Sequence, residues 1–248
     1  MPLIANRDGT PGLREPTPPQ AGNRYREFQA KYFDDPSGFV RDCIIFPKGE
    51  APAPYQYEIL DEFQTSRRIS VRGPHGLGKT AVMAWLIHWF SLTRDGLDWK
   101  LPTTASAWQQ LTKFLWPEVH KWVPRLRWDV IGRPPYKQKA EILDLSIKLG
   151  TGSAFAIASD KPTSIEGAHG DHMLYLFDES KAIPDAIFDS AEGAFSTKTN
   201  IWAVAFSTPG DKSGRFYRIQ TKQPGYQDWW VRHVTMQACI AAGRMSQE

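Results

Sequence analysis

Residues 73–80 read Gly-Pro-His-Gly-Leu-Gly-Lys-Thr and match the pattern G-x-x-x-x-G-K-[ST] without interruption. Glycines in such a loop let consecutive backbone N–H groups point into one concavity, where they bind phosphate oxygens. We expect Lys79 to reach the β- and γ-phosphates of a nucleotide, and the Thr80 hydroxyl to hold Mg²⁺. The predicted phosphate-binding residues are Gly73, Pro74, His75, Gly76, Leu77, Gly78, Lys79 and Thr80.

The segments on either side of this loop have the composition that a phosphate loop requires. Residues 68–72 are short and rich in β-branched side chains, which predicts a buried strand. Residues 80–90 are apolar nearly all round, which predicts a helix buried between a sheet and other elements. This helix is too short to span a membrane and contains His88. The order strand, loop, helix favours a nucleotide site over a fortuitous glycine-rich turn.

A pair of acidic residues follows a second apolar run. Residues 173–177 are continuously apolar, as in a strand covered on both faces, and Asp178 and Glu179 come next. Asp178 is placed to hold Mg²⁺ through a water, and Glu179 to orient and deprotonate the water that attacks the phosphate. The alternative is an acidic N-cap of the next helix. The phosphate loop upstream favours the catalytic interpretation.

Two further candidates are less specific. Ser207 and Thr208 end an apolar run at 201–206, so their hydroxyls can face the γ-phosphate and report hydrolysis; an ordinary polar strand end is the alternative. Gln56 can read the adenine edge while Tyr55 stacks on the base, and a surface glutamine is the alternative.

The remaining pattern predicts an α/β domain with a mostly parallel sheet. We expect a further strand over 99–104, a helix over 106–123, an irregular basic segment over 124–135 and a hairpin around Gly150-Thr151-Gly152. Two short helices are expected within 25–46, a helical stripe over 55–63, and a helix opened by Pro184. The proline-rich residues 1–24 are expected to form a flexible arm, which leaves 25–248 for one domain.

Composition limits the class of protein. The 248 residues carry a net charge of +3, which permits contact with nucleic acid without arguing for it. Cys43 and Cys239 lack metal-site spacing, and reduced, structural thiols fit a cytosolic compartment. No signal peptide or targeting helix is recognisable at the N-terminus.

Taken together, these segments resemble the ATPase domain of bacteriophage and prophage large terminase subunits, over about residues 38–235. Pro54-Tyr55-Gln56 looks like the adenine motif of that family, 72–80 like Walker A, and 174–180 like Walker B with its catalytic glutamate. Phe206-Ser207-Thr208-Pro209 with Ser213-Gly214-Arg215-Phe216-Tyr217 resembles the coupling motif and the signature that follows it. Gly167-Ala168-His169-Gly170 and 183–188 are also similar to prophage members.

The resemblance implies a P-loop fold of the additional-strand type, with the coupling strand between the Walker A and Walker B strands and a small lid region near the C-terminal end. It implies an ATP hydrolase that uses Mg²⁺ to translocate double-stranded DNA in the host cell cytoplasm. It also implies a ring of subunits, monomeric in isolation, on a portal protein, with a small terminase subunit as partner and no membrane. DNA would be held by backbone contacts rather than by sequence readout.

Two departures from the family pattern matter. Many members carry an arginine finger shortly before Walker B, where this chain has Ser164-Ile165-Glu166-Gly167. The finger must therefore come from elsewhere or be absent. One candidate is Arg72, which we place with Lys79 and Glu179 as catalytic; the others are Arg125, Arg127 and Arg133, for which solvated loop charges or DNA contacts are the alternatives. Family members also continue into a nuclease domain, for which we find no carboxylate cluster, so we expect no DNA cleavage by this chain.

Two other functions remain open. A helicase-like or remodelling ATPase shares an Asp-Glu pair and a similar Ser-Thr pair, and it would separate strands. A nucleotide-gated assembly module would bind ATP without releasing phosphate.

Overall fold

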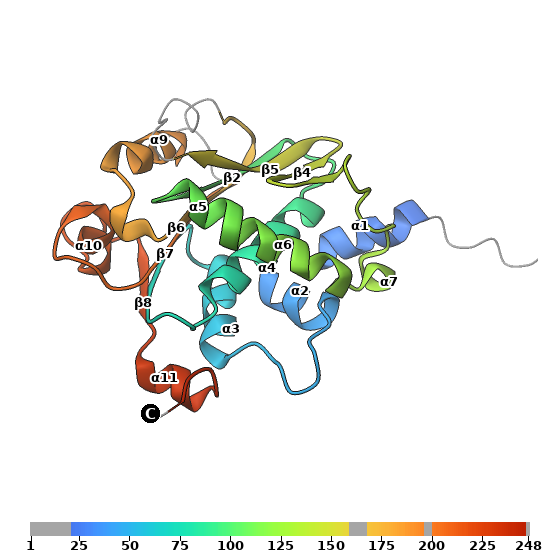
Figure 1. The fold of residues 1–248 in the computed structure, drawn as a ribbon. Helices are drawn as coiled ribbons and strands as arrows, with labels where there is room; N and C mark the ends of the chain where they lie inside the picture. The colour runs from blue at the N-terminus through green and yellow to red at the C-terminus, as the bar shows by residue number, and fades with distance from the viewer. Residues whose placement is uncertain (1–20, 159–167, 196–199, 247–248) are drawn as a thin grey trace, which may run out of the picture.

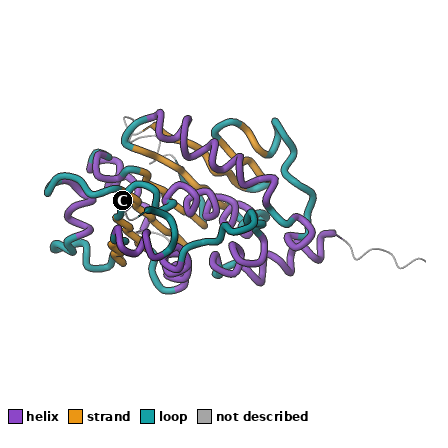
Figure 2. Tube along the Cα trace, turned by 60° about the horizontal axis from the view of Figure 1, so that its bottom comes forward, coloured by secondary structure: helices purple, strands orange, loops and turns teal. Residues whose placement is uncertain are grey.

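A computed structural model describes residues 21–158, 168–195 and 200–246, and within them an eight-stranded sheet flanked by helices (Figures 1 and 2). The strands are β1 (Arg68–Arg72), β2 (Trp99–Ala105), β3 (Ile142–Leu143), β4 (Ser146–Leu149), β5 (Gly152–Ala158), β6 (His172–Asp178), β7 (Asn200–Ser207) and β8 (Trp230–His233). The α-helices are α1 (Ala21–Tyr32), α2 (Pro36–Cys43), α3 (Pro54–Asp61), α4 (Lys79–Thr93), α5 (Trp108–Gln110), α6 (Trp116–Trp122), α7 (Trp128–Ile131), α9 (Asp185–Phe195), α10 (Gly214–Gln220) and α11 (Met236–Ala241). Shorter turns are η1 (Glu62–Gln64), η2 (Leu111–Leu115), η3 (Val123–Arg125) and η4 (Ser180–Ala182).

The strand order is β3-β4-β5-β2-β6-β7-β1-β8. Neighbours from β5 to β8 are parallel, whereas β3, β4 and β5 pair antiparallel at one edge. The predictions of an α/β fold, a mostly parallel sheet and an inserted hairpin are therefore confirmed. β7 lies between β1 and β6, as the resemblance to the additional-strand class implies.

Helices cover both faces of the sheet, which explains why the central strands are apolar without alternation. Along β6, Leu174 and Leu176 join the core on the α4 face, whereas Met173, Tyr175 and Phe177 join the core beneath α9 and α10. Figure 1 shows α9 and α10 on the opposite side of the strands from α2 and α3. The central strands are thus buried between two packed layers.

Helix α4 is the centre of the larger core. It packs against α1, α2, α6 and the sheet, and its Trp85 and Trp89 side chains are each only 1% exposed. Burial of each such side chain stabilises the fold by about 1.5–3 kcal/mol. The predicted buried helix over 80–90 is confirmed, and it extends to Thr93.

The helix predicted over 106–123 is present as a continuous helical run over 108–122 that contains a π-helical turn. A π-helical turn, η2, separates α5 from α6, and Pro117 lies in the first turn of α6. Proline has no N–H to continue an α-helical ladder, so the regular α-helical hydrogen-bond pattern is interrupted at Pro117. The segment predicted to be irregular over 124–135 contains α7, which ends at Ile131 and is followed by Gly132 in a left-handed conformation with φ 78°.

Other boundaries differ by a few residues. Residues 21–24, which we expected in the arm, belong to α1, and residues 1–20 lie outside the described part. α9 begins at Asp185, after Pro184 rather than at it. β8 and α11 were not predicted. The lid region stays a prediction.

Cys43 and Cys239 are both buried and free, as expected of structural thiols. In the parts of the chain described above, no helix combines the length and apolar character needed to cross a membrane.

Candidate active site

The predicted phosphate loop connects β1 directly to α4. Strand β1 ends at Arg72 and α4 begins at Lys79, so the loop spans 73–78. Gly76 and Gly78 have φ values of 85° and 87°, a left-handed conformation that side chains with a Cβ rarely adopt. The glycines therefore allow the backbone to curl in front of the first turn of α4.

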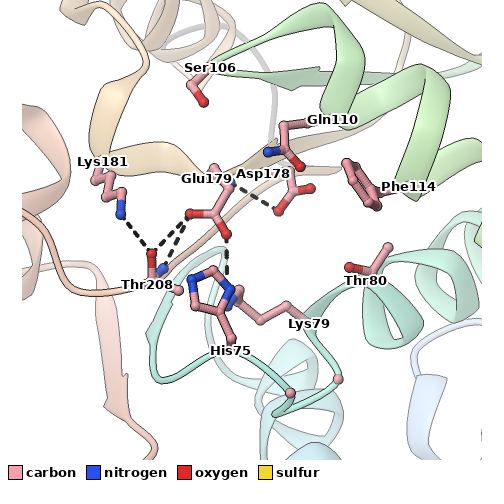
Figure 3. A pocket seen from close by; sticks show the side chains of 12 residues that line it. His75, Lys79, Thr80, Ser106, Gln110, Phe114, Asp178, Glu179, Lys181 and Thr208 are labelled. Atoms are coloured by element: carbon pink, nitrogen blue, oxygen red, sulfur yellow. Dashed lines mark hydrogen bonds and ion pairs between the residues drawn. The ribbon is translucent and has the colours of Figure 1, made fainter.

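A cavity of about 560 Å³ opens above this loop at the carboxyl edge of the sheet (Figure 3). Its size lies in the range of small-molecule sites, about 300–1,000 Å³. The parallel register brings Ser207 beside Arg72 and Asp178 beside Ala105, so four strands end at this edge. The lining residues are His75, Gly76, Gly78, Lys79, Thr80, Ser106, Gln110, Phe114, Asp178, Glu179, Lys181 and Thr208.

Lys79 lies at the base of the cavity and is 8% exposed. Its Nζ donates a hydrogen bond of 3.3 Å to the Pro74 carbonyl and lies 3.9 Å from Oε1 of Glu179. Burial lowers the pKa of the Lys79 ammonium, and the negative charges of Glu179 and Asp178 oppose that shift. An anion bound in the loop would stabilise the charged form of the partly desolvated Lys79 side chain.

Asp178 is the last residue of β6 and is 4% exposed. Burial and the neighbouring charge of Glu179 raise the pKa of Asp178 to about 7, although the Glu179 backbone N–H donates to its Oδ1 at 3.0 Å. A buried carboxyl group with a raised pKa in a cavity is a candidate ligand for a cation. Thr80 lines the same cavity, and a hydroxyl with a carboxylate is a donor set that suits Mg²⁺.

Glu179 is held by the end of β7. Its Oε2 accepts hydrogen bonds from Ser207 Oγ at 3.3 Å and from Thr208 Oγ1 at 3.2 Å. The Glu179 backbone has φ 46° and ψ 48°, a left-handed conformation that is costly for a residue with a side chain. Such strain is found where a side chain must be aimed, and here it directs the carboxylate toward Lys79 and β7.

The two residues predicted to sense the γ-phosphate thus contact the predicted catalytic base. Ser207 is fully buried and Thr208 is 4% exposed, and only Thr208 lines the cavity. Their role in reporting hydrolysis stays a prediction, and the hydrogen bonds to Glu179 supply a physical route for it.

Gln56 lies behind the phosphate loop and does not line the cavity. It is fully buried; its Oε1 accepts from the Ala53 N–H at 2.8 Å, and its Nε2 is 3.4 Å from both the Leu77 and Gly78 carbonyl oxygens. Tyr55 donates from its hydroxyl to the Leu77 carbonyl at 3.1 Å. Recognition of adenine by Gln56 stays a prediction, and its observed contacts support the loop from below.

Arg72 ends β1 but lies outside the cavity lining. It lines a smaller cavity of about 170 Å³ with Lys181 and Tyr217, and its Nε is buried without a hydrogen-bond partner in the described residues. Its catalytic role stays a prediction.

The other three arginine candidates contact elements remote from the phosphate loop. Arg125 lies over the Trp122 ring at 4.9 Å, and Arg127 pairs with Asp129 at 3.7 Å. Arg133 pairs with Glu141 at 2.6 Å. Residues 164–167, with Glu166, lie outside the described part of the chain.

Sequence reasoning missed four of the lining residues. Ser106, Gln110 and Phe114 follow β2, whose end lies beside Asp178. The rule that parallel strands end at one edge could have identified Ser106, as it identified Asp178. Lys181, two residues after Glu179, donates from its Nζ to Thr208 Oγ1 at 2.8 Å.

Comparison with known proteins gives one curated relative and several similar structures. No protein-family model matches the chain. A probable terminase large subunit from Enterobacteria phage P7 is 28% identical over 202 residues, which cover 78% of this chain and 39% of that protein. The chain therefore spans about two fifths of the curated relative that it matches.

The solved structures are phage terminases with similar folds and low sequence identity. The ATPase domain of the Thermus phage P74-26 large terminase gives a TM-score of 0.55 at 19% identity, covering 75% of this chain and 81% of that one. The large terminase of a thermophilic bacteriophage gives 0.58 at 14% identity, covering 80% and 48%. The bacteriophage HK97 large terminase gives 0.57 at 15% identity, covering 81% and 43%. The chain therefore has the P-loop fold of phage large terminase ATPase domains and is similar in sequence to a terminase large subunit.

Proposed function

We propose that this chain is the ATPase motor domain of a viral DNA-packaging terminase, which hydrolyses ATP to translocate double-stranded DNA into a procapsid. The observation that carries this proposal is the placement of Glu179. Its carboxylate lies 3.9 Å from the Lys79 ammonium and accepts hydrogen bonds from Ser207 and Thr208. The residues that we propose as base and phosphate-binding lysine, Glu179 and Lys79, thus line one cavity with Thr208 of the proposed coupling segment.

Each residue has a role that follows from its position. The backbone of 73–78 and Lys79 bind the β- and γ-phosphates, and Thr80 and Asp178 hold Mg²⁺. Held there, Mg²⁺ would supply positive charge that offsets the negative charge of the phosphate oxygens. Glu179 orients a water molecule toward the γ-phosphorus and accepts its proton, so that the bond to the β–γ bridging oxygen breaks and inorganic phosphate leaves.

Support for nucleotide binding comes from the similar structures. The large terminase of the thermophilic bacteriophage has been solved with ADP and with ATP-γ-S. By analogy we propose that ATP and Mg²⁺ bind here, and that double-stranded DNA, a portal protein and a small terminase subunit are partners. A homo-oligomeric ring in the host cytoplasm, an arginine finger from a neighbouring subunit and a lack of DNA cleavage by this chain belong to the same proposal.

Paired substitutions in the cavity test this proposal. Lys79→Ala removes the phosphate-binding ammonium and should abolish both ATP binding and phosphate release. Glu179→Ala should bind ATP at near-normal affinity and lose turnover by at least about a hundredfold, because general base catalysis typically contributes 10²–10⁴-fold. Glu58→Ala is a matched control, because Glu58 is exposed and pairs with Arg232 away from the cavity.

The outcomes separate the candidate functions. Near-normal hydrolysis by Glu179→Ala would show that another residue is the base. Binding of ATP without phosphate release, with DNA and at high protein concentration, would support the assembly module. Strand separation by the unaltered chain would support the helicase-like ATPase.

A further inference from the structure

Lys181 lies at the junction between the nucleotide cavity and the segment that follows β7. Lys181 belongs to η4, the turn that directly follows Glu179, and its side chain lines the cavity. Its Nζ donates to Thr208 Oγ1 at 2.8 Å and to the Pro209 carbonyl at 3.3 Å (Figure 3). The same Thr208 hydroxyl donates to Glu179 Oε2 at 3.2 Å. One chain of hydrogen bonds therefore joins Lys181 to the catalytic carboxylate.

The rest of Lys181 is also tied to this segment. Its backbone N–H donates to Ser207 Oγ at 3.3 Å. Its aliphatic stem crosses Gly210 so closely that a Cβ on Gly210 would lie 2.8 Å from Lys181 Cδ. A movement of the Lys181 side chain would therefore change contacts with residues 207–210.

The acceptors that now hold the Lys181 ammonium are weaker than a phosphate. The Thr208 hydroxyl and the Pro209 carbonyl are neutral acceptors, whereas a phosphate oxygen carries negative charge and adds a direct Coulomb attraction to the ammonium. Lys79 lines the same cavity, and the charge of Lys181 repels that of Lys79. A terminal phosphate in the cavity has oxygens for both ammonium groups and would relieve their repulsion.

We propose that Lys181 senses the terminal phosphate of a bound nucleoside triphosphate. The Lys181 ammonium exchanges its hydrogen bonds with Thr208 and Pro209 for bonds with the phosphate, and the conformation of segment 207–210 changes as a result. This inference rests on the proposed function, since it needs ATP in the cavity. It supplies a cation from the same chain on the γ-phosphate side of the site. In the hydrogen bonds of the described residues, Thr208 contacts no residue of the phosphate loop. Its bond with Lys181 would therefore couple the contacts of Thr208 to the presence of the third phosphate.

The test compares a nucleotide that carries the third phosphate with one that lacks it. Lys181→Met keeps most of the stem over Gly210 and removes the ammonium, and Lys181→Arg keeps the charge. Binding of ATP-γ-S and of ADP, each with Mg²⁺, is measured by titration calorimetry. Lys148→Met on the exposed face of β4 is the control for loss of a surface lysine.

We expect Lys181→Met to weaken ATP-γ-S binding about tenfold and to change ADP binding less than about twofold, because one charged hydrogen bond to the third phosphate is lost. Lys181→Arg should restore most of the preference for ATP-γ-S, and Lys148→Met should match the unaltered chain. An equal loss for both nucleotides, or no loss for either, would overturn the inference. An unaltered chain that binds neither nucleotide would overturn the proposed function together with it.

Hydrogen exchange measures the response of the segment. ATP-γ-S, but not ADP, should change the exchange of peptides that cover 203–217 in the unaltered chain, and Lys181→Met should abolish that difference. A difference that persists unchanged in Lys181→Met would show that the phosphate acts on 207–210 by another route.

Discussion

Replacement of Gln56 by leucine separates two roles for this residue. The resemblance to terminases predicts that Gln56 reads adenine. Its observed hydrogen bonds are with the backbone of Ala53, Leu77 and Gly78 and with the Arg244 side chain. Leucine has a similar size and no polar atoms. Gln56→Leu therefore keeps the packing and removes every hydrogen bond of the side chain.

The cost follows from the contacts that are lost. The substitution removes the 2.8 Å bond from Ala53 N–H, the 3.3 Å bond that Arg244 donates to Gln56 Oε1, and two long contacts of 3.4 Å to the loop carbonyls, all at a fully buried side chain. A net hydrogen bond contributes about 0.5–1.5 kcal/mol, and a buried backbone group left unpaired costs about 1–3 kcal/mol. We expect a loss of about 3 kcal/mol in the free energy of unfolding, dominated by the Ala53 N–H. With a urea m-value of about 3 kcal/mol/M, the unfolding midpoint falls by about 1 M.

Urea unfolding and binding of ATP and GTP check this prediction together. If Gln56 supports the loop, affinities for ATP and GTP fall by a similar factor. Gln29→Leu is the matched control, because Gln29 also donates to two backbone carbonyls, of Leu92 and Asp95, remote from the cavity. A selective loss of ATP binding, with GTP binding and stability preserved, would refute the support role and would favour recognition of adenine by Gln56.

Three further predictions concern other parts of the structure. Burial lowers the pKa of His88 from 6.5 to about 4, so the folded state disfavours its protonation; stability is complete above pH 6.5 and is lost as the pH falls toward 4. The free energy of unfolding should therefore be lower at pH 4 than at pH 7 by about 3 kcal/mol on account of His88. Unfolding of the unaltered chain and of His88→Leu, each at pH 7 and pH 4, should show a weaker pH dependence in the variant. Gly152→Ala places a Cβ 2.3 Å from the Trp99 carbonyl oxygen and should cost about 2–3 kcal/mol in urea unfolding, whereas Gly150→Ala, with no atom within 4 Å, should be near neutral; equal costs would contradict the register of β2 and β5. Thr208→Val removes the hydroxyl that donates to the carboxylate of Glu179, the proposed base, and should lower kcat about tenfold in phosphate release while KM for ATP changes little. An unchanged kcat would contradict a role of Thr208 in orienting that carboxylate.

Local patterns were sufficient to predict the centre of the fold. β1 has the predicted bounds 68–72, and α4 and β6 agree within a few residues, because segments covered on both sides are continuously apolar. The motif at 73–80 fixes the phosphate loop, since few other sequences can place its backbone N–H groups together. The position of β7 between β1 and β6 came from the family resemblance rather than from its composition.

The missed features depend on tertiary contacts. β8 lies at the edge of the sheet, its residues are partly exposed, and it has no apolar run to identify it. Nothing in the local sequence distinguishes Lys181 from a surface lysine. Its ammonium meets Thr208 only because the fold brings η4 beside the end of β7. The motif predicts that Gln56 contacts the ligand, which stays a prediction; the hydrogen bonds of Gln56 to the Ala53 and Gly78 backbone were not predicted. Side chains whose partners are distant in sequence cannot be read from local composition.

The most direct test of the proposed function is phosphate release as a function of protein concentration, with and without duplex DNA. A ring in which a neighbour completes each site predicts hydrolysis that rises more steeply than linearly with concentration and is stimulated by DNA. Glu179→Ala should be inactive under every condition. A chain that binds ATP but releases no phosphate at any concentration, even with DNA present, would contradict the assignment of this fold as a DNA-packaging motor.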